Sequence, residues 1–150
     1  MPTATTLFYK FSMTDSEFEK STVYRLVDAV EYVSGSVVIK SILTKQTGTV
    51  TVSSFDSGEE MPSKSSPFDS LIQILDGVAE IIIEEKSSMV EAGGIIIIPA
   101  HAKNRIKAIS RFKMLTTIIK AGYEDIRLWY KLHDMTIDDQ DNKFNVGDLV

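Results

Sequence analysis

The stretch that decides the fold reads Gly58-Glu-Glu-Met-Pro-Ser-Lys64-Ser-Ser66-Pro-Phe-Asp-Ser70-Leu-Ile-Gln-Ile-Leu-Asp-Gly77. A second stretch follows it and reads Gly93-Gly-Ile-Ile-Ile-Ile-Pro99-Ala-His101-Ala-Lys-Asn104. Both place short apolar runs between glycine, proline, serine and aspartate, which are the residues that turns favour. The pattern predicts short strands joined by tight turns.

The first stretch resembles the first conserved motif of the cupin superfamily. That motif has glycine, five residues, histidine, any residue, histidine, three or four residues, glutamate, six residues and glycine. Its two glycines fall on Gly58 and Gly77 of this chain. Its histidine, histidine and glutamate positions, which commonly bind a metal, fall on Lys64, Ser66 and Ser70.

The second stretch resembles the second cupin motif, which has glycine, five residues, proline, any residue, glycine, two residues, histidine, three residues and asparagine. Gly93 and Pro99 match it, whereas His101, Asn104 and Ala108 replace its second glycine, its histidine and its asparagine. The resemblance covers residues 37–120 and implies an all-β, cupin-like double-stranded β-helix, or jelly roll.

The rest of the chain agrees with an all-β fold. Apolar and β-branched residues recur in short runs, and strands are expected at residues 37–43, 49–55, 70–75, 78–84, 89–91, 95–99, 105–109 and 113–119. Asp76-Gly77 predicts a hairpin turn, because both residues can adopt positive φ. Neither a glycine-rich phosphate loop nor a repeated strand–helix unit is present, which argues against a doubly wound α/β fold.

Three segments are expected along the chain. Residues 1–36 form a short N-terminal extension, in which the region near residues 26–30 fits either a short helix or a strand. Residues 37–120 form the barrel. Residues 121–150 form a C-terminal helix, with apolar residues at helical spacing over 123–135, and an acidic tail that carries five aspartates and one lysine from residue 134 onward.

Composition excludes several classes of protein. The net charge is −5, and the body before the tail is almost neutral, so it lacks the clustered basic face that nucleic acid requires. The longest isoleucine run is too short to span a membrane, and no secretory signal is evident. The chain has no cysteine and therefore no disulfide. We expect a cytoplasmic protein that binds neither nucleic acid nor membrane.

The residues at the ligand positions argue against the usual metal. Lys64 carries an ammonium group without a free electron pair at neutral pH, Ser66 and Ser70 offer neutral hydroxyls, and Asn104 offers one carbonyl oxygen. A transition metal prefers imidazole and carboxylate donors. We therefore expect no metal and no cofactor, and we predict that Lys64, Ser66, Ser70, Asn104 and His101 contact a ligand.

Lys64 and His101 each have two interpretations. Lys64 either binds an anion or acts as a base, or it reaches the barrel mouth and pairs with Asp69 or a glutamate. His101 is either a general acid–base group or a surface residue in the turn after Pro99. The solvated interpretation is favoured for both residues.

The sequence therefore predicts a cupin-like barrel that binds a small polar or anionic molecule without a transition metal. A metal-dependent cupin enzyme, such as a dioxygenase or isomerase, with an unusual ligand set is one alternative. A metal-free isomerase or epimerase that uses His101 or Lys64 is another. Leu71 and Leu75 make the second face of a strand apolar, and small cupins commonly dimerise through such a surface, so we expect a homodimer.

Overall fold

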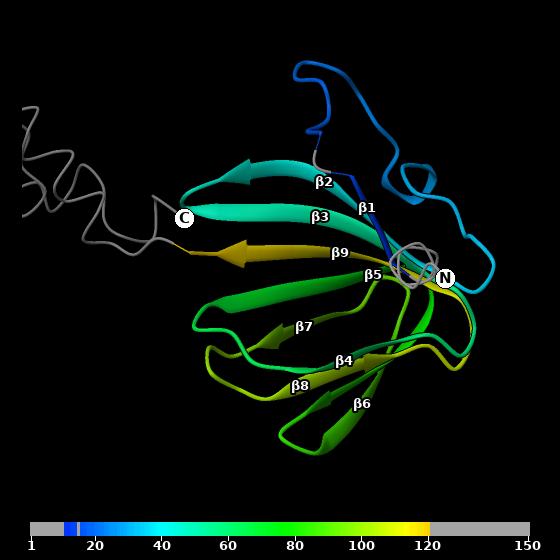
Figure 1. Cartoon of the computed structure of the whole chain (residues 1–150), viewed down its shortest axis with the longest axis vertical. Coiled ribbons are helices and arrows are strands. Elements are labelled where there is room, and N and C mark those ends of the chain that lie inside the picture. Colours follow the sequence, from blue (N-terminus) through cyan, green and yellow to red (C-terminus); the bar gives the residue numbers. More distant parts are fainter. Residues whose placement is uncertain (1–10, 15, 121–150) are drawn as a thin grey trace, which may run out of the picture.

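The computed structural model of the chain describes residues 11–14 and 16–120 (Figure 1). Within these ranges the chain forms nine strands and one short 3-10 helix. In chain order the elements are β1 (Phe11–Thr14), η1 (Leu26–Asp28), β2 (Val37–Lys45), β3 (Gly48–Phe55), β4 (Glu60–Lys64), β5 (Asp69–Ile83), β6 (Lys86–Glu91), β7 (Ile95–Ile98), β8 (Asn104–Lys107) and β9 (Phe112–Ile119).

The strands form two walls that enclose an apolar interior. One wall contains β2, β3, β9, the first half of β5 and β7, and the other contains β4, β8, β6 and the second half of β5. Every pair in these walls is antiparallel, whereas β1 pairs with β2 in parallel. Figure 1 shows the walls curling toward each other around a common interior. The predicted all-β, cupin-like barrel is confirmed.

The hairpin predicted at Asp76-Gly77 is wrong, because β5 runs through these residues as one strand of 15 residues. Residues 70–73 pair with β7, while residues 78–83 pair with β6. Gly77 does adopt the positive φ of a turn, +75°, and the pairing with β9 shifts register between Ile74 and Asp76. The glycine and the bulge therefore bend the strand at a corner, where it passes from one wall to the other, instead of reversing it.

The chain reverses after β5 at Glu84-Glu85, which the sequence did not indicate as a turn. Ile83 pairs with Lys86, so only two residues connect the strands. Both glutamates have positive φ, +48° and +68°, as a two-residue hairpin turn of this hand requires. The Glu84 carboxylate accepts a hydrogen bond from the backbone N–H of Lys103 at 3.0 Å, which supports a conformation that glutamate alone disfavours.

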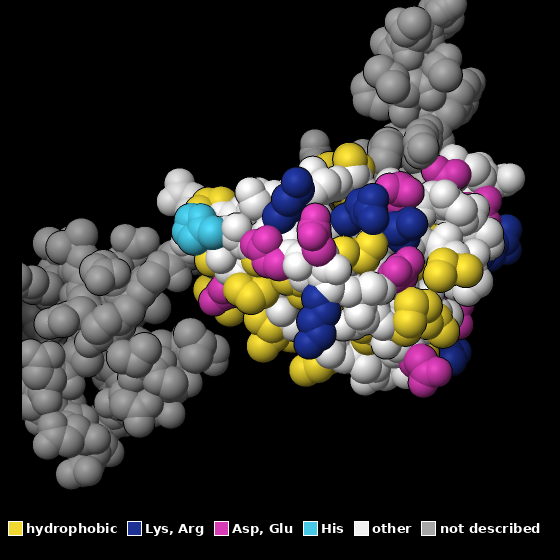
Figure 2. All heavy atoms as spheres, turned by 90° about the horizontal axis from the view of Figure 1, so that it is seen from below, with side chains coloured by type: hydrophobic (Ala, Val, Ile, Leu, Met, Phe, Trp, Pro, Cys, Tyr) yellow, Lys and Arg dark blue, Asp and Glu magenta, His cyan; other side chains and the backbone are white. Residues whose placement is uncertain are grey.

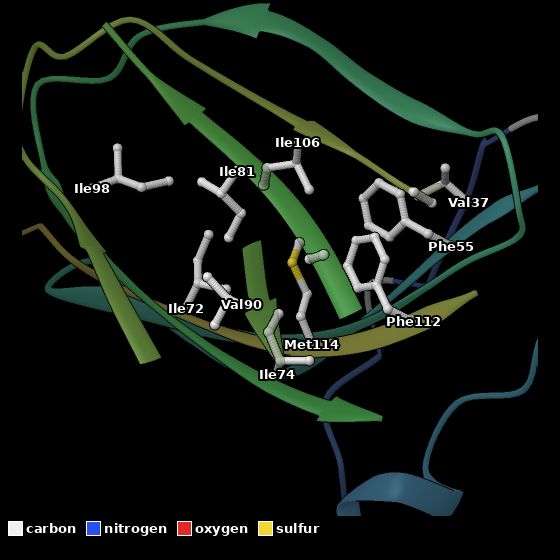
Figure 3. Close-up of a cluster of buried hydrophobic side chains, with 12 residues drawn as sticks. Val37, Phe55, Ile72, Ile74, Ile81, Val90, Ile98, Ile106, Phe112 and Met114 are labelled. Atoms are coloured by element: carbon white, nitrogen blue, oxygen red, sulfur yellow. The ribbon is translucent and has the colours of Figure 1, made fainter. Parts of the chain in front are cut away.

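A cluster of buried hydrophobic side chains runs through the barrel interior (Figure 3). At one end of it the rings of Phe55 and Phe112 stack with centroids 4.4 Å apart, and Val37 and Ile74 belong to the same cluster. These four side chains are fully buried. Toward the opposite end, the apolar interior is joined by polar side chains such as Ser41, Ser53 and Asn104.

The segment before β2 packs against the outside of the first wall. Its short 3-10 helix η1 lies in the region that the sequence predicted to be either helical or extended. The Lys113 ammonium donates a hydrogen bond to the carbonyl oxygen of Val27 at 2.5 Å, and the Ser54 hydroxyl donates one to the carbonyl of Glu31 at 2.7 Å. Val30 is completely buried as a result.

Part of the outer face of this wall remains apolar and exposed. Leu71 pairs with Ile97 and Gln73 pairs with Ile95, which places the three apolar side chains on one face; Ile95 and Ile97 are 61% and 60% exposed. In Figure 2, hydrophobic side chains gather along one side of the face shown, and basic and acidic side chains are interspersed over the rest of it. The homodimer stays a prediction.

The predicted C-terminal helix and acidic tail lie outside the described residues. Among the helices that the structure does describe, none has the length and apolar character needed to cross a membrane.

Candidate functional site

A cavity of about 460 Å³ occupies the end of the barrel opposite the phenylalanine stack. It lies where β4 and β7 end, where β8 begins and where the chain leaves β9, since Lys64, Ile98, Asn104 and Lys120 all line it. Its apolar lining includes Ile39, Met61, Phe68, Ile72, Ile98 and Met114. Its size is in the range that small-molecule sites occupy.

Lys64 is the last residue of β4, at the rim of this cavity. Its side chain is exposed at the rim, yet desolvation by the surrounding barrel lowers the pKa of its ammonium group. The expected pairing with Asp69 is not formed: the Asp69 carboxylate instead accepts a hydrogen bond from the backbone N–H of Ala100 at 2.8 Å. Lys64 has no ion-pair partner in the part of the chain that the structure describes.

Asn104 is the first residue of β8 and pairs with Lys64 across the β4–β8 ladder. It is only 5% exposed. Its amide nitrogen donates hydrogen bonds to two backbone carbonyl oxygens, those of Lys64 at 3.2 Å and Ala102 at 3.1 Å. Because carbonyl oxygens only accept, these partners determine which way the amide is turned. The side-chain oxygen Oδ1 is left buried without a hydrogen-bond partner among the described residues.

Ser66 and Ser70 also line the cavity. Ser66 lies in the loop after β4, and its hydroxyl accepts a hydrogen bond from the backbone N–H of Phe68 at 3.2 Å. Ser70 lies on β5 between Ile98 of β7 and Ile118 of β9. Ile72 lines the cavity from the same face of β5, as the predicted alternation of the strand requires.

His101 is placed differently from the other four predicted site residues. Its side chain is exposed in the turn between β7 and β8, where its φ is +70°, and it is not among the residues that line the cavity. Its backbone N–H donates a hydrogen bond to the carbonyl oxygen of Ser66 at 2.6 Å. The structure thus brings Lys64, Ser66, Ser70 and Asn104 together, while His101 touches the site through its main chain.

Several cavity residues were not predicted from the sequence. The first wall contributes inward-facing hydroxyls, of which Ser41 and Ser53 are almost fully buried and Thr116 is partly buried. The Thr116 oxygen Oγ1 is itself buried, without a hydrogen-bond partner in the described ranges. The only signal in the sequence is strand alternation, which puts Thr116 on the same face as Met114 and Ile118.

The donor set does not fit a first-row transition metal. The positions that align with cupin ligands present one ammonium, two hydroxyls and one amide oxygen, whereas such a metal prefers imidazole and carboxylate donors. Within the described residues, no aspartate, glutamate or histidine lines the cavity, and no three potential ligands of these types or cysteine gather anywhere. The lining is instead positively charged, through Lys64 and Lys120.

Solved structures with the same architecture include two with 30% sequence identity to this chain. A conserved protein of unknown function from Streptococcus pyogenes is 30% identical, with a TM-score of 0.68 over 71% of this chain and 94% of that one. A cupin 2 conserved barrel domain protein from Leptotrichia buccalis is also 30% identical, with a TM-score of 0.63 over 65% of this chain; the matched part is 47% of that protein.

A third structure extends the fold comparison. A cupin superfamily protein from Desulfitobacterium hafniense is 22% identical, with a TM-score of 0.66 over 71% of this chain and 97% of that one. No family model and no curated protein sequence matches the chain. The curled antiparallel barrel, the paired glycine and proline positions and these structural similarities lead to one conclusion: the chain belongs to the cupin superfamily.

Proposed function

We propose that this protein binds a small organic anion in the barrel cavity, without the help of a transition metal. The observation that carries the proposal is the charge of the lining: two lysines and, within the described residues, no acidic side chain. A cation without an ion-pair partner in a partly apolar pocket is an attractive site for an anion, because the low local polarity strengthens the interaction.

The cavity combines this charge with apolar walls and neutral hydroxyls. Met61, Phe68 and Met114 offer surface to a hydrocarbon chain or ring, and methionine adapts its shape to the molecule it contacts. Ser66 and Ser70 supply groups that either donate or accept hydrogen bonds. A ligand with one anionic group and an apolar body fits this arrangement best.

The test begins with the protein as purified, without an affinity tag or a chelator. Denaturation releases bound small molecules, and negative-ion mass spectrometry identifies organic anions present in stoichiometric amounts. The Lys64→Met variant should lose such an anion. The Lys86→Met variant is the matched control, because Lys86 is an exposed lysine at a strand end outside the cavity.

Two results would overturn the proposal. The first is stoichiometric iron, manganese, zinc or nickel in elemental analysis of the same sample, together with its loss on substitution of the cavity residues. The second is an anion that both lysine variants retain equally, because its site would then lie elsewhere.

A further inference from the structure

Two buried oxygen atoms in the cavity walls lack a hydrogen-bond partner among the described residues: Oδ1 of Asn104 and Oγ1 of Thr116. They belong to opposite walls of the barrel, since Asn104 lies on β8 and Thr116 on β9. Both residues line the cavity that holds Lys64. Buried polar atoms in native proteins nearly always have a hydrogen-bond partner, so two that lack one in the residues around a single cavity need an explanation.

The chemistry of the two atoms differs. The Asn104 oxygen can only accept a hydrogen bond, because its amide nitrogen is held by the carbonyl oxygens of Lys64 and Ala102. The Thr116 hydroxyl can donate or accept. A molecule that satisfies Asn104 must therefore bring an N–H or O–H group of its own.

The position of Asn104 restricts that molecule further. Asn104 lies directly opposite Lys64 on neighbouring strands, so the anionic group and the donor of the ligand must be close to each other. A donor that carries a positive charge, such as the ammonium of an amino acid, would meet the Lys64 ammonium unfavourably. A neutral alcohol next to a carboxylate avoids this repulsion. One lysine beside the amide also suits a monoanion better than a phosphate, which has more oxygens to satisfy.

We propose that the ligand is a 2-hydroxycarboxylic acid with an apolar side chain. Its carboxylate contacts Lys64, its hydroxyl donates to the Asn104 oxygen, and its side chain lies against Met61, Phe68 and Met114. This inference rests on the proposed binding of a small organic anion and adds the requirement for a hydrogen-bond donor beside the charge.

The experiment uses ligand series that differ in one group at a time, measured by isothermal titration calorimetry on the full chain. Mandelate is compared with phenylacetate, which lacks the hydroxyl, with O-methylmandelate, whose oxygen only accepts, and with mandelamide, which lacks the charge. A second pair, 2-hydroxy-4-methylpentanoate and 4-methylpentanoate, removes dependence on the ring. In both series the hydroxy acid should bind about tenfold more tightly than its deoxy partner. O-methylmandelate should bind no better than phenylacetate.

The outcomes separate the two proposals. Equal binding of hydroxy and deoxy acids, with weak binding of mandelamide, overturns the 2-hydroxy acid and leaves an anion site. Binding of mandelamide as tight as that of mandelate, or no binding in either series at 10 mM (about 100-fold above a moderate dissociation constant), overturns both.

A pair of variants on one strand tests whether the second unpaired oxygen takes part. Thr116→Val keeps the shape of the side chain and removes the hydroxyl, whereas Thr117→Val makes the same change at the next residue of β9, which does not line the cavity. Thr116→Val should raise the melting temperature of the ligand-free protein by about 2–4 °C and weaken mandelate binding at least threefold, roughly what a modest hydrogen bond contributes. Thr117→Val should leave mandelate binding unchanged. Equal effects on binding at both positions would contradict a role for the Thr116 hydroxyl.

Discussion

The side-chain amide of Asn104 donates a hydrogen bond to the backbone carbonyl oxygen of Lys64 at 3.2 Å, and so joins the first residue of β8 to the last residue of β4. In a metal-binding cupin, the two aligned positions would both carry histidine. Here the two side chains have different roles. Asn104 hydrogen-bonds the backbone at the rim of the cavity, whereas Lys64 contributes a positive charge to the cavity lining. Substitution of Asn104 should therefore affect mainly the stability of the fold, and substitution of Lys64 mainly the binding of an anion.

Substitution of Asn104 by alanine should lower the free energy of unfolding by about 1–2 kcal/mol, because two backbone carbonyls lose their donor. Substitution by aspartate should cost more at neutral pH, since a carboxylate has no donor and would face those carbonyls. Urea denaturation measures the free energy of unfolding of both variants. An aspartate variant as stable as the parent at pH 7 would contradict the assigned direction of the two hydrogen bonds.

Gly77 and Gly58 both have positive φ, +75° and +84°, but their surroundings differ. A Cβ atom at Gly77 would lie 2.1 Å from the carbonyl oxygen of Arg111, whereas nothing lies within 4 Å of one at Gly58. Gly58→Ala should cost about 1 kcal/mol from backbone strain alone. Gly77→Ala should cost more than about 3 kcal/mol, because backbone must move. Thermal unfolding of the two variants checks the difference, and equal costs would show that the corner of β5 tolerates a side chain.

The Tyr32 hydroxyl donates a hydrogen bond to the Asp76 carboxylate at 2.5 Å, and this contact ties the N-terminal segment to the corner of β5. Desolvation, and then the bond to Asp76, raises the pKa of Tyr32 above its ordinary value. The unfolded chain therefore loses the tyrosine proton first, at about pH 10. The stabilising contribution is present below that pH and declines as the pH rises further.

Replacement of Tyr32 by phenylalanine should therefore lower the free energy of unfolding by about 1 kcal/mol at pH 7. Above pH 10, the free energy of unfolding should also fall less steeply with pH in this variant than in the parent protein. Tyr24→Phe provides the control, because Tyr24 is partly exposed and forms no bond to a carboxylate within the described residues. A parallel decline in the parent and the Tyr32 variant would argue against the Tyr32–Asp76 contact.

Lys64 should reduce the stability of the ligand-free protein. Burial lowers the pKa of its ammonium group, so folding disfavours the charged form. The penalty is fully present below the folded-state pKa, and it disappears as the pH approaches the unfolded-state value of about 10.5. Because the Lys64 side chain is exposed at the rim and solvent screens its charge, the effect should be small: Lys64→Met should raise the melting temperature at pH 7 by about 1 °C, with a smaller gain at pH 10. Lys86→Met should change it little, and a destabilised Lys64 variant would contradict desolvation as the cause.

The cavity was only partly predictable. The spacing from Gly58 and Gly93 aligned Lys64, Ser66, Ser70 and Asn104 with the ligand positions of the two cupin motifs, and the structure places all four around one cavity. The sequence did not predict Thr116 as a cavity residue, because strand alternation is the same whether a threonine faces a cavity or packs against a neighbour. The expected Lys64–Asp69 pairing is not formed; the Asp69 carboxylate accepts a hydrogen bond from the backbone N–H of Ala100, a contact that no local pattern in the sequence indicates.

The turns show the same division between local and distant information. The Asp76-Gly77 pair correctly indicated positive φ at Gly77, but whether the chain reverses there depends on which strands the two halves of β5 meet. The true reversal at Glu84-Glu85 has no local signal, since glutamate rarely adopts positive φ and is held here partly by Lys103, 18 residues beyond Glu85 in the printed sequence.

The amino-acid sequence by itself did not indicate β4 or the continuity of β5, but it determined the all-β architecture, most of the strands that form the barrel and the residue types at the positions that align with cupin ligands. These follow from alternation, from turn residues and from residue type, which are local properties. Only the tertiary structure decided that Asn104 and Thr116 each keep an unpaired buried oxygen beside one cavity, and that Lys64 stands there without an acidic partner among the described residues. Hydrogen-bond satisfaction depends on every group that surrounds an atom, and those groups come from strands far apart in the chain.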